Sequence, residues 1–233
     1  MNRSFKKFAA ISVIVTPILF IILTTIAMFL FPGGFSVSGI VFPSPYYRFD
    51  INFFSDLGML TTEAGRPNIP SAILWCIALT SVGISFLLYA ITLPSYFQKK
   101  TPQRILAVIS SIIAALSAVG FIGIAWTPWD ILFWPHIFFV FFAFPVAIGY
   151  SSLFCISIFM KKAYPNIFGY LLILFSIAMG IYLWFLFGGP SLEGFEGRII
   201  GALAQKAIVY IMIVLIPVQA VGSLIAMKSD QSK

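Results

Sequence analysis

Six long apolar stretches dominate the chain, and short polar stretches separate them. They cover approximately residues 8–31, 71–94, 105–126, 131–158, 166–187 and 200–227. Each has about the 20 residues that a helix needs to cross a hydrocarbon core of about 30 Å. The stretches lack the alternation of apolar and polar residues that a transmembrane barrel requires, and a lone strand in lipid would leave its backbone polar groups unpaired. The pattern therefore predicts an all-α, polytopic membrane protein with six transmembrane helices in one bundle.

The same pattern predicts a single transmembrane domain, residues 1–233, without a detachable soluble module. The first apolar stretch follows Arg3, Lys6 and Lys7, as in a secretory signal peptide. It is longer than the roughly 7 to 15 apolar residues of such a peptide, so we expect it to be retained as the first helix. The long connection 32–70 is rich in glycine, proline and aromatic residues. We expect it to lie on the bundle or in the membrane interface, where amphipathic rings are favoured.

Composition supports a membrane protein, and the distribution of charge adds its orientation. Only 9% of the residues are charged and 61% are hydrophobic, against about 25% charged in an average soluble domain. The net charge of +7 is scattered between apolar stretches rather than gathered on one basic face, so no nucleic-acid partner is expected. Cytoplasmic loops carry an excess of lysine and arginine. Most of the 14 cations lie in the two tails and in the second and fourth links, namely Arg3, Lys6, Lys7, Lys99, Lys100, Arg104, Lys161, Lys162, Lys228 and Lys233.

This distribution predicts cytoplasmic N- and C-termini in a multi-pass protein of the cell membrane, with membrane lipids as partners. The opposite side then holds the remaining cations and all acids except Asp230. These residues are Arg48, Arg66, Arg198, Lys206, Asp50, Asp56, Glu63, Asp130, Glu193 and Glu196.

Cysteine and histidine usage argues against disulfide and metal chemistry. Cys76 and Cys155 are expected at opposite ends of their helices, over roughly 20 Å apart in depth, whereas a disulfide needs Cα atoms within about 7 Å. We predict two free thiols. His136 is the only histidine, and zinc sites require three or four His, Cys or carboxylate ligands. No metal and no cofactor is expected.

Four external residues near helix ends are candidates for a cap or a site. His136 lies one to two turns into the fourth helix, and an ionisable residue at that depth is a functional candidate. The alternative is a neutral imidazole that bonds to a neighbouring helix or the interface. Asp130 directly precedes the fourth helix, where we predict that it caps the helix. Ser55 and Asp56 are placed to cap a short helix through Leu57 to Leu60.

The stretch GFEGRIIGALAQK, residues 194–206, adds a further polar group at the start of the last helix. Glu196 and Arg198 lie where this helix begins, and Gln205 and Lys206 follow about two turns later. Lys206 is expected either to extend outward along its own stem or to pair with a carboxylate such as Asp56 or Glu196.

Four stretches together resemble a known family. They are NFFSDLGML, RPNIPSAILW, WPHIFFVFFAF and EGFEGRIIGALAQ. The chain resembles the archaeal and bacterial six-helix membrane family known as domain of unknown function 998, and more distantly the eukaryotic Frag/DRAM/Sfk group, whose members are linked to lipid remodelling, phosphoinositide organisation and autophagy. In two places the chain departs from the family pattern, because Gly197 separates Glu196 from Arg198 and Ile69 separates Asn68 from Pro70. The resemblance implies functional roles for Ser55, Asp56, Asn68, His136, Glu196 and Arg198.

Three classes of function follow from these groups. The leading hypothesis is an outward-facing polar pocket that binds a lipid or amphiphile head group, with Arg198 and Lys206 holding phosphate. Its ligand-binding residues are Asp56, Asn68, His136, Glu196, Arg198 and Lys206. The alternative is a lipid-modifying enzyme for ester or phosphoester chemistry, with His136 as base, Asp56 or Glu196 orienting it and Ser55 beside them. The third is a structural or regulatory subunit, with a homo-oligomer or a membrane partner left open.

Overall fold

A computed structural model describes residues 1–187 and 194–229 of the chain, and it is all-helical except for one small hairpin. The helices are α1 (Arg3–Leu30), α2 (Ile69–Thr92), α3 (Pro102–Ala125), α4 (Phe133–Phe159), α5 (Ile167–Phe187) and α6 (Gly194–Ser229). All six are long and apolar enough to span a membrane. The six predicted helices are therefore confirmed, although α1 and α6 begin five or six residues earlier than their apolar stretches, at Arg3 and Gly194.

Sequence signals account for where several helices begin. The side chain of Asn2 accepts a hydrogen bond from the backbone N–H of Ser4 at 3.0 Å and thereby caps α1. Pro70 and Pro102 lie in the first turns of α2 and α3, where a residue without an N–H costs nothing. The short polar links thus end one helix and start the next.

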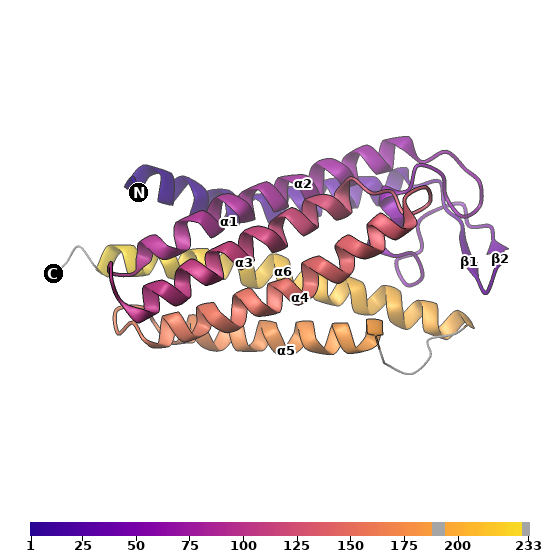
Figure 1. The fold of residues 1–233 in the computed structure, drawn as a ribbon. Coiled ribbons are helices and arrows are strands. Elements are labelled where there is room, and N and C mark those ends of the chain that lie inside the picture. The colour runs from indigo at the N-terminus through magenta and orange to yellow at the C-terminus, as the bar shows by residue number, and fades with distance from the viewer. Residues whose placement is uncertain (188–193, 230–233) are drawn as a thin grey trace.

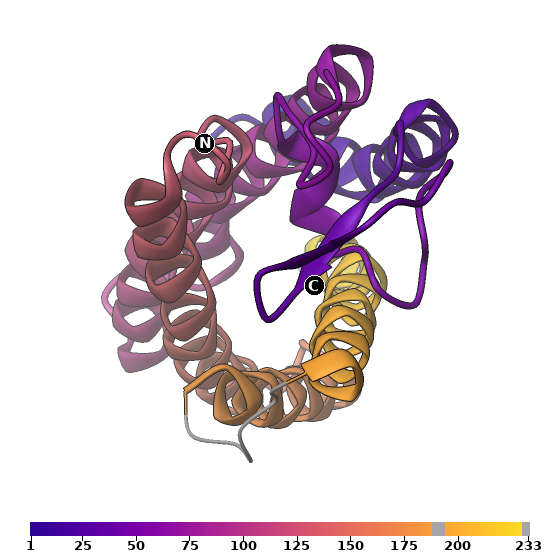
Figure 2. The same cartoon turned by 90° about the vertical axis from the view of Figure 1, so that its right-hand side faces the viewer.

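The helices form a closed ring in chain order. Each helix packs against the next one, and α1 also packs against α6. Figure 2 shows this ring along its axis, and Figure 1 shows that the molecule is elongated. The N-terminus and the last turns of α6 lie at one end, here called the terminal end. Residues 31–68, here called the cap segment, lie at the opposite end, here called the cap end.

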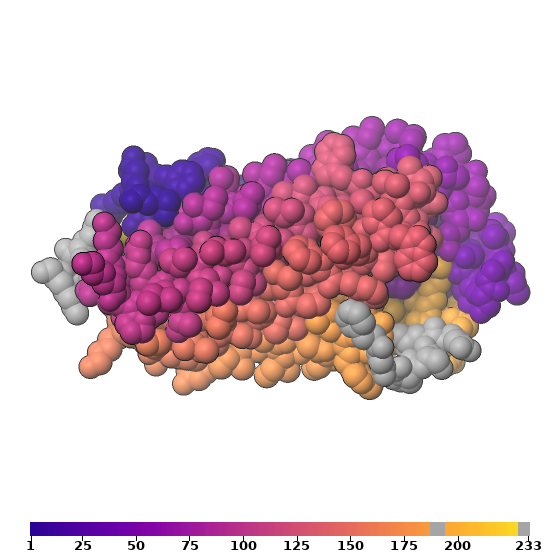
Figure 3. Space-filling model, in the orientation of Figure 1, coloured from indigo at the N-terminus to yellow at the C-terminus, as the bar shows by residue number. Residues whose placement is uncertain are grey.

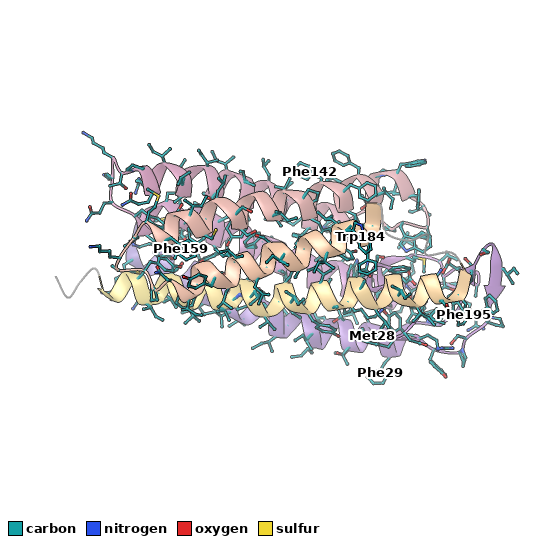
Figure 4. All side chains as sticks on the ribbon, turned by 90° about the horizontal axis from the view of Figure 1, so that it is seen from below. Met28, Phe29, Phe142, Phe159, Trp184 and Phe195 are labelled. Carbon is teal, nitrogen blue, oxygen red and sulfur yellow. The ribbon has the colours of Figure 1, made fainter. Side chains whose placement is uncertain are left out.

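The outer surface of the ring is apolar along its length. Phe29 is 85% exposed and points away from the bundle in Figure 4. Large exposed apolar side chains occur on all six helices, and Figure 3 shows the helices closed into one continuous wall on the side of α3 and α4. A helix that is apolar on every face belongs in a large core or in a membrane. The fold therefore suits an integral membrane protein.

The cap segment is packed against the bundle, as its aromatic composition predicts. It contains the antiparallel hairpin of β1 (Phe35–Val37) and β2 (Ile40–Phe42) and the short 3-10 helix η1 (Phe54–Gly58). Phe54 is buried and stacks on Trp75 of α2, with 6.2 Å between ring centroids. Gly58 allows this close approach, because a Cβ there would lie 2.4 Å from Trp75 Cδ1. Phe195 of α6 meets the hairpin through the rings of Phe35 and Phe42 (Figure 4).

Two other predictions concern cysteines and charges. Cys76 and Cys155 are both free, as expected. The charge assignments of Glu193, Asp230 and Lys233 lie outside the described residues.

Candidate functional site

Asp56 lies at the centre of a buried polar cluster at the cap end. It is fully buried on η1. Its Oδ2 accepts hydrogen bonds from the backbone N–H of Phe53 at 2.9 Å and from Asn52 Nδ2 at 3.1 Å. Its Oδ1 accepts one from Trp129 Nε1 at 3.3 Å. The prediction that Ser55 and Asp56 cap a helix through Leu57 to Leu60 is wrong in position, because η1 begins at Phe54 and contains both residues. Asp56 accepts from the backbone of the cap residue Phe53 from the third helical position.

Arg198 of α6 ties this carboxylate to the rest of the cap segment. Its Nη2 donates to Asp56 Oδ2 at 3.2 Å and to Glu63 Oε2 at 2.6 Å. Its Nη1 donates to Glu63 Oε1 at 3.2 Å and to the carbonyl of Ser36 at 2.6 Å, while Nε donates to the carbonyl of Ile51 at 3.3 Å. A guanidinium has five N–H donors, and all five are engaged by the chain itself. The arrangement leaves no N–H of Arg198 free for a phosphate.

Lys206 occupies an aromatic cage on the same helix. The side chain is buried, and its Nζ donates to the backbone carbonyl of Asn52. Three rings surround the ammonium with centroids 5.0 to 5.6 Å away, those of Tyr47, Phe49 and Phe54. Neither alternative predicted for Lys206 is found, because the stem does not extend to the surface and no ion pair with Asp56 or Glu196 forms within the described residues. The ammonium group of Lys206 is therefore stabilised by cation–π contacts and a backbone carbonyl instead of by a carboxylate.

Burial controls the protonation of the polar cluster. It raises the pKa of the Asp56 carboxyl to about 6, although the Arg198 guanidinium and the hydrogen bond from Asn52 act in the opposite direction. Burial, together with the nearby charge of Asp56, also raises the pKa of the Tyr47 hydroxyl well above its ordinary value. At neutral pH the carboxylate is therefore mostly ionised and the ion pair with Arg198 is present.

Two amide side chains fasten the cap segment to the helices. Gln205 Oε1 accepts a hydrogen bond from the backbone N–H of Phe54 at 2.7 Å. Asn68 is fully buried, and its Nδ2 donates to the carbonyls of Leu57 and Met59 at 3.2 and 2.8 Å. The bonds of Asn68 hold the turn after η1, so this predicted ligand-binding residue serves the backbone of its own chain.

Asp130 has a different role from the one predicted. Its carboxylate accepts hydrogen bonds from the backbone N–H groups of Leu60 at 3.2 Å and Thr61 at 2.9 Å. The cap residue of α4 is Leu132, and it makes no side-chain capping bond. The prediction that Asp130 caps α4 is therefore wrong. Its carboxylate oxygens accept from the backbone N–H groups of Leu60 and Thr61, which follow η1, instead of from the first turn of α4.

His136 is buried apart from this cluster, on the first turn of α4. It is 5% exposed, and its Nδ1 lies 2.7 Å from the backbone carbonyl of Thr127. A carbonyl oxygen can only accept, so Nδ1 carries the proton. Within the described residues Nε2 has no hydrogen-bond partner. Neither Asp56 nor Glu196 orients the ring, and Glu196 is exposed to solvent.

An interior cavity of about 80 Å³ begins beside His136. Ser55 of η1 and Gln205 of α6 also line it, and most of the remaining wall is apolar. The wall extends along α2 from Trp75 to Phe86 and along α6 from Gln205 to Ile216. Eleven residues at about 1.5 Å each give a length of roughly 16 Å along the ring axis. The cavity is therefore long and narrow, and its polar groups gather mainly at the cap end.

Several residues of the site were absent from the sequence-based list. Glu63, Asn52 and Trp129 all contact the central ion pair or the carboxylate of Asp56. Asn52 lies one turn before Asp56, a spacing that offers a usable signal. Glu63 and Trp129 carry no such signal, because they are distant in sequence from the groups that they meet.

Comparisons of this chain with protein-family models, with curated proteins and with solved structures find no match. The resemblance to the domain of unknown function 998 family therefore stays a prediction.

Proposed function

We propose that this chain is a multi-pass protein of the cell membrane, with cytoplasmic termini, that binds a single-chain amphiphile inside its ring of helices. The six apolar helices and their exposed apolar faces support membrane insertion. Cations such as Lys7, Lys100 and Lys161 belong to the terminal end, which supports a cytoplasmic location for that end. Membership in the domain of unknown function 998 family is part of this proposal.

The interior cavity is the observation that carries the proposal. Its length of roughly 16 Å is about half of a hydrocarbon core of about 30 Å, which is the depth of the acyl chains of one leaflet. A volume of about 80 Å³ excludes two hydrocarbon chains, and one chain fits only when flexible side chains of the wall such as Met212 move aside. Ligand pockets are typically apolar with a few polar groups that fix orientation, and here His136, Ser55 and Gln205 supply them.

The polar cluster around Asp56 has a structural role and does not bind the ligand. Arg198 and Lys206 bond to Asp56, Glu63 and backbone carbonyls of the cap segment, so their charges are already satisfied. We therefore assign the cluster to holding the cap segment on α6 at the end of the cavity. The ligand's polar end is assigned to the cavity rather than to these two cations.

The hydrolytic alternative has less support from the geometry. A serine nucleophile requires a hydrogen bond to its base, and the base requires a second group that orients it. No hydrogen bond joins Ser55 to His136 within the described residues, and a backbone carbonyl rather than a carboxylate holds the ring of His136.

The test compares two equal enlargements on α6. Val209 lines the cavity, whereas Val214 is 59% exposed on the outer face. The wild type, Val209→Phe and Val214→Phe are purified from membranes in mild detergent, and bound lipids are extracted and quantified by mass spectrometry. We expect the wild type and Val214→Phe to retain the same single-chain species at about one per chain, and Val209→Phe to lose it.

Thermal unfolding of the three proteins provides the control for folding. A Val209→Phe protein that melts like Val214→Phe and still retains the full amount of the species would refute the proposal. So would a wild type that carries no single-chain species above the level of the detergent blank.

A further inference from the structure

We infer that the polar end of the bound amphiphile is an uncharged hydroxyl group that donates a hydrogen bond to Nε2 of His136. The inference rests on the proposed function and adds the chemical class of the ligand. It starts from His136, a buried residue that lines the cavity and whose second ring nitrogen, Nε2, has no partner within the described residues.

The backbone selects the tautomer of His136. The carbonyl of Thr127, 2.7 Å from Nδ1, can only accept a hydrogen bond, so the proton lies on Nδ1. In a neutral imidazole the other nitrogen then bears a lone pair and no hydrogen. Nε2 is therefore an acceptor, and a complementary ligand has to donate to it.

The surroundings keep the ring uncharged. Among the described residues no carboxylate, lysine or arginine lines the cavity, and His136 is 5% exposed. A buried charge without a counter-ion is costly, whereas a neutral imidazole needs only its hydrogen bonds. Because Nε2 has no partner within the described residues, a ligand that donates to it gains a hydrogen bond on binding.

Two further groups complement the oxygen of a hydroxyl. The Oε1 of Gln205 accepts a hydrogen bond from the backbone N–H of Phe54, so its Nε2 amide group remains as a donor toward the cavity. Ser55 Oγ makes no hydrogen bond within the described residues and lines the same cavity. A hydroxyl can donate to His136 and accept from Ser55 or Gln205, which uses both of its capacities.

The same lining disfavours charged head groups. A phosphate would need a cation and a quaternary amine would need a carboxylate as counter-ion, and the described residues of the cavity wall include neither. The aromatic cage around Lys206 is filled by that lysine. The geometry thus points to a long-chain alcohol or another single-chain lipid that ends in a neutral hydroxyl group.

The experiment replaces the hydroxyl hydrogen of the ligand by a methyl group, which removes the hydrogen-bond donor and keeps the oxygen. Delipidated wild-type protein is titrated with dodecanol, with dodecyl methyl ether and with dodecyl phosphate, and occupancy is measured by native mass spectrometry. Because a hydrogen bond to an otherwise unpaired buried acceptor contributes about 1 to 2 kcal/mol, dodecanol should bind about tenfold more tightly than its methyl ether. Dodecyl phosphate should bind more weakly than dodecanol.

Two variants locate the effect. In His136→Leu the preference for the alcohol over the ether should disappear while both still bind. Trp134→Leu is the control, since Trp134 lies on the same turn of α4 and is 77% exposed, and it should keep the preference. Thermal unfolding checks that both variants fold, and the wild-type comparison of the ligands stands without either of them.

The outcomes separate the two proposals. Equal binding of alcohol and ether by the wild type, tighter binding of the phosphate, or a preference that survives in His136→Leu would overturn the hydroxyl assignment and leave chain binding intact. Failure of all three ligands to bind the wild type would overturn the proposed function itself.

Discussion

Replacement of Arg198 by methionine tests whether the polar cluster holds the cap segment on the bundle. Methionine keeps much of the length of the side chain and removes the charge and all five donors. Asp56 would keep a buried carboxylate, and Glu63 would lose both of its bonds to the guanidinium. The carbonyls of Ser36 and Ile51 would also lose a donor.

The expected loss is large because the partners are buried. The side chains of Asp56, Glu63 and Arg198 are 0%, 13% and 13% exposed. Removal of one partner from a buried pair typically costs about 3 to 5 kcal/mol, a large part of a total stability of about 5 to 15 kcal/mol. The pair of Arg48 and Asp50 is the control in the same segment, since its side chains are 36% and 44% exposed. Arg48→Met should cost about 0.2 to 1 kcal/mol.

The assay is reversible unfolding in mixed micelles with increasing SDS, followed by tryptophan fluorescence. Asp56→Asn and the double variant complete a thermodynamic cycle. The loss of stability in the double variant should be about 1 to 3 kcal/mol smaller than the sum of the losses in the two single variants. The reason is that the double variant no longer contains the Asp56 carboxylate that Arg198→Met leaves without a counter-ion. Equal losses in Arg198→Met and Arg48→Met would refute the reasoning, and so would strict additivity in the cycle.

Three further outcomes are expected. Because the native pKa of Asp56 is about 6 and its ordinary value is 3.8, the folded state holds this proton more tightly. The stability of the wild type relative to Asp56→Asn should therefore fall by about 2 kcal/mol as the pH rises from about 4 to 7, as melting in parallel buffers will measure. Lys206→Met should leave the melting temperature unchanged or raise it, since an apolar side chain in an aromatic cage avoids the cost of burying an ammonium, and a loss comparable to that of Arg198→Met would contradict this. Gly58→Ala should destabilise by about 1 to 3 kcal/mol because its Cβ would overlap Trp75, whereas Gly180→Ala on α5 meets nothing within 4 Å and should stabilise by up to about 1 kcal/mol in the same unfolding assay.

The helices were predictable because their cause is local. Each apolar stretch is long enough to span a bilayer, and a helix satisfies its own backbone groups without reference to the rest of the chain. The largest deviation is at α6, which begins at Gly194 rather than at residue 200. Its first turns are polar, and their helical form depends on contacts such as those of Arg198 and Phe195 with the cap segment.

The candidate site was predictable only in part. Asp56, His136, Arg198 and Lys206 stand out as ionisable residues in an apolar chain, and all four have buried or nearly buried side chains at the cap end. Their partners did not stand out. Arg198 forms its ion pair with Glu63, which is 135 residues away in the sequence. Glu196, only two residues away in the sequence, is exposed.

The sequence by itself determined that the chain forms six helices suited to a membrane, that its thiols stay free, and which residues carry its scarce chemistry. These properties follow from transfer energies and spacings that add up locally along the chain. Only the tertiary structure decided that Asp56 points at Arg198 while His136 faces a separate apolar cavity, and that Lys206 is surrounded by rings instead of a carboxylate. The reason is that several acceptors and donors compete for each buried charge, and the position of the cap segment on the ring decides which of them comes within reach.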